Sequence, residues 1–191
     1  MAHKFAEIAF TRTVRRIQEL MGSRSGYSAL DSRPDCNHLL RDREAAFIAA
    51  RDSFYIASVS ETGWPYIQHR GGPKGFMKVL DESTLGFADY SGNRQYVTTG
   101  NVQSNDRVAL FFMDYPNRRR LKLLGRLRLV DSSDASTLAR LHDDGYKARV
   151  ERGMIIHVEA FDWNCPQHIT PRYSQSEVEE LLESMGHEEH D

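Results

Sequence analysis

In the stretch RLKLLGRLRLV, residues 120–130, basic and apolar residues alternate at nearly every position. Leucine or glycine stands at almost every odd-numbered position up to 129, and Arg or Lys stands at the even ones apart from Leu124. A period of two is that of a β-strand, because successive side chains of a strand point to opposite faces of its sheet. The pattern therefore predicts a half-buried strand with one cationic face, in a chain organised around a sheet.

Short apolar and β-branched runs, separated by turn residues, surround this strand. FYIASVS and WPYIQHR flank the turn ETG, while FMKVL and TLGFAD flank DES, so each pair predicts a hairpin. RVALFFM is apolar almost throughout, which is typical of a strand buried on both faces or against a partner chain. With GMIIHVEAF as a last strand, we expect a mainly β (α+β) fold: an antiparallel sheet of about six strands curled into a small barrel, with peripheral helices.

Helices are expected at the edges of this barrel. Apolar spacing predicts helices over residues 11–21, 42–50, 95–100, roughly 136–149, and in the tail, where Ser176 and Glu179 have the spacing of a capping box. We expect the chain to divide into an N-terminal helix and irregular crossing segment (1–38), a barrel domain (39–173), and an acidic C-terminal helix and tail (174–191).

Charge and cysteine content limit the classes of function. The formal net charge of −2 gives no overall field for nucleic acid or an anionic membrane, and no apolar stretch approaches the roughly 18 residues of a membrane span. Cys36 and Cys165 are the two cysteines, too few for a disulfide framework. These features favour a cytoplasmic protein with no nucleic-acid or membrane partner.

Polar side chains follow two predicted strands at the point where each strand ends. His69 and Arg70 precede a glycine pair, and Asn93, Arg94 and Gln95 follow FADYSG and open the predicted short helix. Free N–H groups at a helix start, together with guanidinium groups, favour a phosphate-bearing ligand. The alternative is a pair of ordinary turns, with Asn93 as a helix cap and Arg94 in solvent.

The basic residues between 118 and 128 and the stretch DWNCPQH leave further alternatives open. The cations could form a nucleic-acid stripe, a phosphate site, or a solvated face paired with acids such as those of the tail. Arg120 and Lys122 are the site candidates among them, since they lie nearest the strand end. Trp163 could lie against an aromatic ligand or close the barrel. Cys165 and His168 lack a second ligand pair, so we expect no metal site.

The order of FYIASVSETGWPYIQHRGG, LGFADYSGNRQ, NVQSNDRVALFFMD and RRLKLLGRLRLV resembles that of the pyridoxamine 5′-phosphate oxidase-related flavoproteins. WPYIQHRGG and DWNCPQH resemble the predicted flavin-nucleotide-binding branch more narrowly. The resemblance covers about residues 40–173 and implies a split β-barrel homodimer with FMN at the subunit interface.

The resemblance also implies roles for individual residues. Residues 68–70, Gln68, His69 and Arg70, would form the strand that holds the FMN phosphate, and residues 93–95 would form the phosphate-binding turn. Asn93 and Gln95 depart from the usual serine and lysine of that turn, whereas Arg94 matches it. Arg120 occupies the place of the residue that meets the flavin ring from the other subunit. WNCPQHITPR matches only loosely the stretch with which the oxidases bind pyridoxal phosphate.

Two functions follow from this resemblance. The first is an FMN-dependent oxidoreductase of the pyridoxamine 5′-phosphate oxidase-like type, acting with an unidentified small-molecule electron donor or acceptor. The second is a non-enzymatic protein that stores or senses FMN, since one fold serves many functions. No catalytic residue can be assigned from the sequence.

Overall fold

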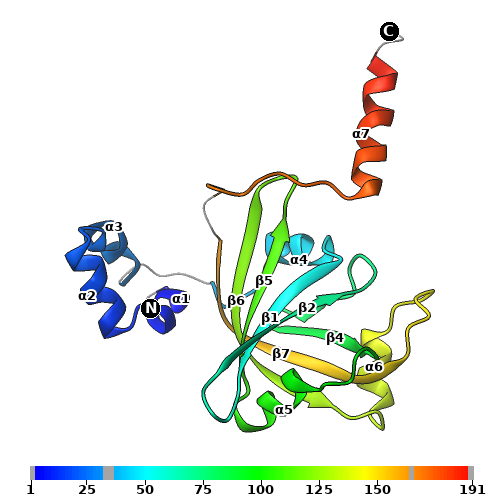
Figure 1. The fold of residues 1–191 in the computed structure, drawn as a ribbon, viewed down its shortest axis with the longest axis horizontal. Helices are drawn as coiled ribbons and strands as arrows, with labels where there is room; N and C mark the ends of the chain where they lie inside the picture. The colour runs from blue at the N-terminus through cyan, green and yellow to red at the C-terminus, as the bar shows by residue number, and fades with distance from the viewer. Residues whose placement is uncertain (1–2, 32–36, 164–165, 189–191) are drawn as a thin grey trace.

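The computed structural model describes residues 3–31, 37–163 and 166–188 of the chain. Seven strands form one antiparallel sheet in the order β2-β1-β5-β6-β7-β4-β3. They are β1 Ser53–Val59, β2 Pro65–Gly71, β3 Lys78–Asp81, β4 Thr84–Tyr90, β5 Arg107–Asp114, β6 Arg119–Val130 and β7 Val150–Trp163. The sheet curls on itself without closing, because no pairing joins β2 to β3 within the described residues (Figure 1). The expected split barrel is confirmed, with seven strands where about six were expected.

The alternating strand lies at the centre of this sheet as β6, between β5 and β7. Leu121, Leu123 and Leu127 are buried on its inner face, and the basic side chains lie on its outer face, as predicted. The register with β7 shifts at Gly125, where an added Cβ would come within 2.6 Å of the backbone oxygen of His157. Glycine is therefore required at this β-bulge because the two backbones approach too closely for any side chain.

An aromatic cluster forms the middle of the core. The ring of Phe54 lies 5.6 Å from that of Phe76, 5.2 Å from Phe87 and 5.3 Å from Phe112, centroid to centroid. These four side chains are almost fully buried, and leucines, isoleucines and methionines of the strands surround them. The strand β5 buries only alternate side chains within this subunit, so its outer face, with Phe111, is partly exposed.

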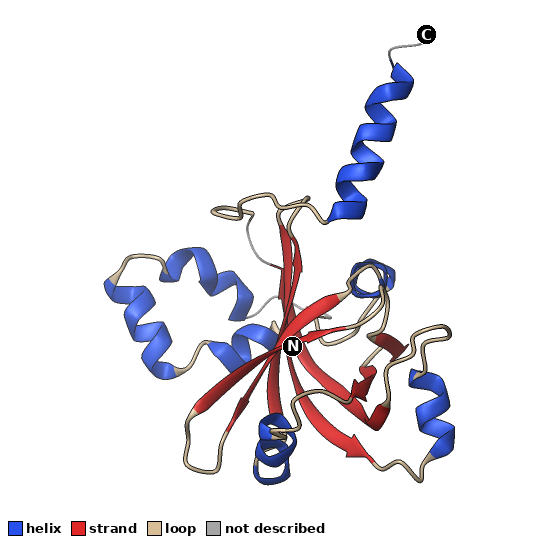
Figure 2. Cartoon of the chain, turned by 45° about the vertical axis from the view of Figure 1, so that its right-hand side comes forward, coloured by secondary structure: helices blue, strands red, loops and turns tan. Residues whose placement is uncertain are grey.

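Helices lie around the sheet at several places (Figures 1 and 2). They are α1 Lys4–Ala9, α2 Arg12–Leu20, α3 Arg24–Tyr27, a 3-10 turn Ser28–Asp31, α4 Asp42–Ala49, α5 Val97–Ser104, α6 Ala135–Leu141 and α7 Gln175–Glu188. The helices predicted at 11–21 and 42–50 are confirmed, and Phe47 of α4 is buried in the core. None of the described helices is long and apolar enough to cross a bilayer.

Three boundaries differ from the predictions. The helix α5 begins at Val97 and continues past Gly100 to Ser104, and the N–H of Asn105 still donates to the carbonyl oxygen of Asn101. The helix α6 ends at Leu141 rather than near 149, since the breaker sequence DDGY follows it. In the tail, Ser174 and Glu177 form the capping pair instead of Ser176 and Glu179, because α7 begins earlier, at Gln175.

Candidate functional site

A pocket of about 180 Å³ opens where β2, the end of β4, the loop 91–96 and the start of β7 meet. Five of the nine predicted site residues line it: Gln68, Arg70, Asn93, Arg94 and Gln95. The strands β2 and β4 are far apart in the sheet order, so the pocket lies at the opening of the split barrel. The curling of the sheet thus brings together two polar strand ends that lie some twenty residues apart in the sequence.

The pleat of β2 decides which of its side chains enter the pocket. Gln68 and Arg70 point to the same face, since they are two residues apart, and both line the pocket. The amide oxygen of Gln68 accepts a hydrogen bond from the Thr98 hydroxyl at 3.1 Å, which fixes the Gln68 side chain against α5. His69 points to the opposite face, where its ring meets that of Tyr55 edge-on at 5.5 Å. His69 therefore does not line this pocket.

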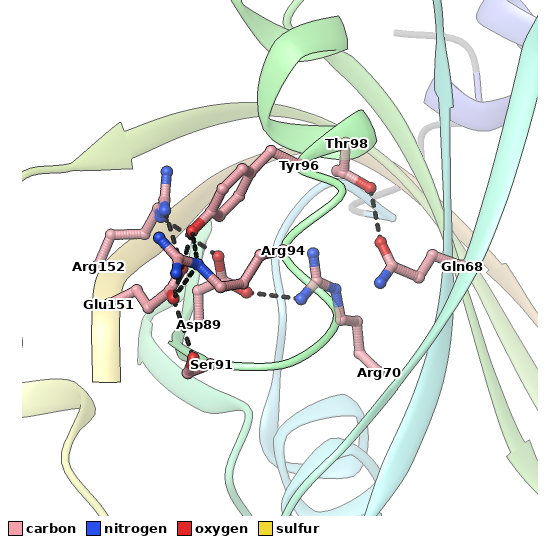
Figure 3. A network of polar contacts seen from close by, with 9 residues as sticks. All are labelled: Gln68, Arg70, Asp89, Ser91, Arg94, Tyr96, Thr98, Glu151 and Arg152. Carbon is pink, nitrogen blue, oxygen red and sulfur yellow. Dashed lines mark hydrogen bonds and ion pairs between the residues drawn. The ribbon is translucent and has the colours of Figure 1, made fainter. Parts of the chain in front are cut away.

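A buried ion pair forms the floor of the pocket (Figure 3). Nη1 of Arg70 donates to Oδ1 of Asp89 at 2.5 Å, with only 16% and 6% of the two side chains exposed. Nε of Arg152 lies 3.4 Å from the other oxygen of Asp89. Burial raises the pKa of Asp89, and the two guanidinium groups oppose that rise. Nε of Arg70 is buried and makes no hydrogen bond within the described part of the chain, which leaves it able to donate.

The loop 91–96 holds two residues in left-handed backbone conformations. Arg94 has φ 59° and Tyr96 has φ 56°, and each such non-glycine residue costs about 1 kcal/mol or more. The Asn93 side chain accepts from the backbone N–H of Gln95 at 3.2 Å, which is a local turn. The alternative reading of Asn93 as a helix cap is therefore wrong, because α5 begins only after Tyr96. This turn of the backbone places Arg94 at the rim of the pocket.

Glu151, at the start of β7, ties the loop in place. It accepts hydrogen bonds from the hydroxyls of Ser91 at 3.0 Å and Tyr96 at 3.3 Å, and from Nη2 of Arg152 at 3.0 Å. These bonds, that of Ser91 above all, lower the pKa of Glu151. Nε of Arg94 donates to the Tyr96 hydroxyl at 2.9 Å and lies 3.9 Å from Glu151, while 70% of its side chain remains exposed. Arg94 is therefore anchored at one nitrogen and open to a ligand at the others.

The remaining predicted site residues lie elsewhere in this subunit. Nζ of Lys122 pairs with Asp162 at 2.8 Å, and Arg120 is half-buried on the outer face of β6, with an Nε that makes no hydrogen bond in the described residues. The indole N–H of Trp163 donates to Glu44 at 2.8 Å, and its ring meets Phe47 edge-on at 4.7 Å. Trp163 thus joins β7 to α4 in this subunit.

Two of the outer cations of β6, Lys122 and Arg126, form ion pairs with acids of neighbouring strands and loops. Arg126 pairs with Asp106 at 2.9 Å and with Glu159 at 2.8 Å. These partners come from the loop before β5 and from β7 rather than from the acidic tail, because cross-strand neighbours on one face lie within reach. Cys165 lies outside the described residues, and no group of three His, Cys, Asp or Glu suited to a metal occurs among those described.

Sequence reasoning missed Asp89, Glu151, Arg152 and Tyr96. One signal was present for Asp89: Leu85, Phe87 and Asp89 share a face of the predicted strand, so a carboxylate follows two core positions. Such a buried acid needs a cationic partner, and Arg70 was the basic residue of the other polar strand end. Glu151 and Arg152 had no comparable signal, because their meeting with the loop depends on the β4–β7 register.

Fold and pocket together define an antiparallel split-barrel protein with a guanidinium-lined pocket at the opening of its sheet. The model of the family described as pyridoxamine 5′-phosphate oxidase matches residues 40–160, more than half of the chain. The chain therefore belongs to the pyridoxamine 5′-phosphate oxidase family. The match spans β1 to most of β7 and includes every residue of the pocket.

Several solved structures are similar to this chain at low sequence identity. A provisionally named pyridoxamine 5′-phosphate oxidase from Lactobacillus delbrueckii is 19% identical, with 66% of this chain and 96% of that chain covered and a TM-score of 0.51. An FMN-binding protein from Syntrophomonas wolfei is 12% identical, with coverages of 80% and 95% and a TM-score of 0.48. An F420 reductase is 16% identical, with coverages of 68% and 98% and a TM-score of 0.45. No curated protein matches the chain.

Proposed function

We propose that this chain is an FMN-binding flavoprotein and acts as an oxidoreductase on a small molecule. The observation that carries the proposal is the convergence of Arg70 and Arg94, from two separate segments, on one pocket in a chain of this family. Guanidinium groups bind phosphate through paired N–H donors, which makes them suited to the phosphate of a flavin nucleotide.

The donor set fits an anion. Three guanidinium groups, Arg70, Arg94 and Arg152, face two carboxylates, Asp89 and Glu151, so the cluster keeps one positive charge when both acids are ionised. The buried Nε of Arg70 is without a hydrogen bond among the described residues, and a phosphate oxygen is the acceptor that would satisfy it. In this arrangement Arg70 and Arg94 bind the phosphate, and the Gln68 amide orients it.

The size of the pocket supports a site shared between two subunits. Pockets that enclose a whole ligand of this class measure roughly 300–1,000 Å³, against about 180 Å³ here. The pocket therefore suits the phosphate end, and the ring system would extend beyond it. We propose a homodimer with FMN at the subunit interface, in which Arg120 and Lys122 of a second copy approach the ring.

The bound flavin would supply the redox chemistry, and the protein would bind, orient and shield it. The hydrogen bonds to the phosphate would fix the position of the flavin ring relative to the subunit surface. We assign no catalytic residue and no substrate. On the sequence argument of two cysteines without a disulfide framework, the setting we propose is the cytoplasm.

A non-enzymatic role in FMN storage or sensing is the second candidate. It is favoured by the way the titratable groups of the pocket bind one another: among the described residues, Asp89 and Glu151 are both held by arginines. Both carboxylates are therefore engaged in ion pairs within the protein.

The first experiment is the visible absorption spectrum of the purified full chain and of its heat-released supernatant. Two flavin bands, with FMN recovered, are expected. A colourless protein that also fails to bind added FMN would overturn the proposal. A panel of electron donors, including NADH, NADPH and pyridoxamine phosphate, then separates the two candidates: bleaching of the bound flavin supports the oxidoreductase, and its failure across the panel supports the binder.

A further inference from the structure

Two helices of this chain carry apolar stripes that other described residues leave uncovered. On α2 and its C-cap, Val14, Ile17, Leu20 and Met21 are between 37% and 78% exposed. On α7, Val178, Leu181 and Leu182 are between 42% and 63% exposed. In each helix the exposed residues recur at spacings of three and four, so they share one side of the helix. Large apolar groups gathered on one side of a helix usually mark a contact surface.

The two stripes do not cover each other within one subunit. Figures 1 and 2 both show α2 with α1 and α3 on one side of the barrel, while α7 extends away from another side. The N-terminal helices are linked to the barrel through the contact of α1 with β7, and α2 itself contacts α3. Each stripe therefore faces solvent in the isolated subunit.

The two ends of the chain carry opposite charge. Residues 1–30 contain five Lys or Arg against two Glu, whereas residues 174–191 contain seven Asp or Glu and no Lys or Arg. On the helices, Arg12 and Arg16 are exposed on α2, and Glu179 and Glu180 are exposed on α7. Opposite charges on two helices that each carry an apolar stripe favour their association and fix which surfaces meet.

We propose that α7 of one subunit packs on α2 of a second copy of this chain. In a symmetric dimer the contact forms twice, so both basic helices and both acidic helices are covered at once. A lipid surface as the occupant of α2 would leave the apolar stripe of α7 exposed, because the acidic residues of α7 are repelled by anionic headgroups. The inference rests on the homodimer of the proposed function and adds which segments hold it together.

A cross-linking experiment tests the pairing. Two differently tagged full-length chains, both with Cys36→Ser and Cys165→Ser, are co-expressed, one with Ile17→Cys and the other with Leu181→Cys. Because the new cysteines are on different chains, a disulfide between them reports contact between subunits only. The matched control replaces Leu181→Cys with Glu180→Cys, which lies on the same helix but away from the stripe.

The expected result is a disulfide-linked heterodimer in several-fold higher yield with Leu181→Cys than with Glu180→Cys. A dimer by light scattering with equal or absent cross-linking overturns the helix pairing, and so does a monomer. Binding of the dimer to phosphatidylserine vesicles through α2, abolished by Ile17→Asp, would also overturn it. The flavin spectrum of the same samples reports separately on the FMN proposal, which stands if flavin is bound and the cross-link is missing.

Discussion

Arg70 on β2 and Asp89 on β4 form an ion pair of 2.5 Å between strands that are separated by four others in the sheet order. The open sheet has no backbone hydrogen bonds between these strands in the described chain, so side chains take part in joining its two sides across the opening. The candidate phosphate pocket lies at this junction. The same arginine is thus placed to stabilise the barrel and to bind a ligand.

The Arg70–Asp89 pair gives the first prediction. Replacing Asp89→Asn leaves the buried guanidinium group of Arg70 without its carboxylate, whereas Arg152 keeps its pair with Glu151. Breaking a buried pair in this way costs about 3–5 kcal/mol. We expect the free energy of unfolding in urea to fall by roughly that amount. Asp106→Asn is the control, because it breaks an exposed pair with Arg126 and should cost only about 0–1 kcal/mol. Equal losses for both variants would contradict the role given to Asp89.

Ligand affinity gives the second prediction. Arg94→Ala removes a charge-assisted donor worth about 1.5–3 kcal/mol, so the FMN dissociation constant should rise by roughly 10- to 100-fold. The fold should persist, because the Arg94 side chain is largely exposed. Fluorescence titration measures the affinity, and Arg128→Ala, on the outer face of β6, should leave it unchanged. Arg94→Lys should be intermediate, since lysine keeps the charge without the guanidinium fork.

The pH dependence of stability gives the third prediction. The pKa of Glu151 lies below its ordinary value of 4.5 in the folded protein. Its hydrogen bonds therefore contribute stability that is present above pH 4.5 and is lost as the pH falls through the lowered pKa. Glu151→Gln should lack this part of the acid destabilisation. Other acids with lowered pKa, such as Asp81 and Asp134, act in both proteins, so the difference between their unfolding curves isolates Glu151.

Two glycines give the fourth prediction. Gly125→Ala would place a methyl group 2.6 Å from the His157 backbone oxygen, so we expect a loss of about 1–3 kcal/mol in the free energy of unfolding. Gly100→Ala lies within α5, where nothing stands within 4 Å of the new methyl group, and should raise stability by about 0.5–1 kcal/mol. Thermal unfolding of the two variants should therefore shift in opposite directions, and a shared direction would contradict the assigned environments.

Local sequence patterns predicted much of the fold. The alternation over residues 120–130 predicted β6 and its faces, since a strand with one buried side must alternate. The extent of α5 was not predicted, because glycine is a helix-ending signal when only neighbouring residues are considered, whereas the folded helix continues through Gly100. The capping pair of α7 was displaced by two residues, since several Ser and Glu residues in the tail offer equivalent spacings.

The sequence by itself determined the strands, the faces of β6, and the presence of two polar strand ends, because each depends on residues that are neighbours along the chain. Only the tertiary structure decided that Arg70 pairs with Asp89 and that Glu151 holds the loop of Arg94 in place. It also decided that His69 contacts Tyr55 and that Trp163 contacts Glu44, both outside the pocket. Those contacts join segments brought together by the curl of the sheet and by the β4–β7 register. Their distances depend on the packing of the whole core, which no local pattern records.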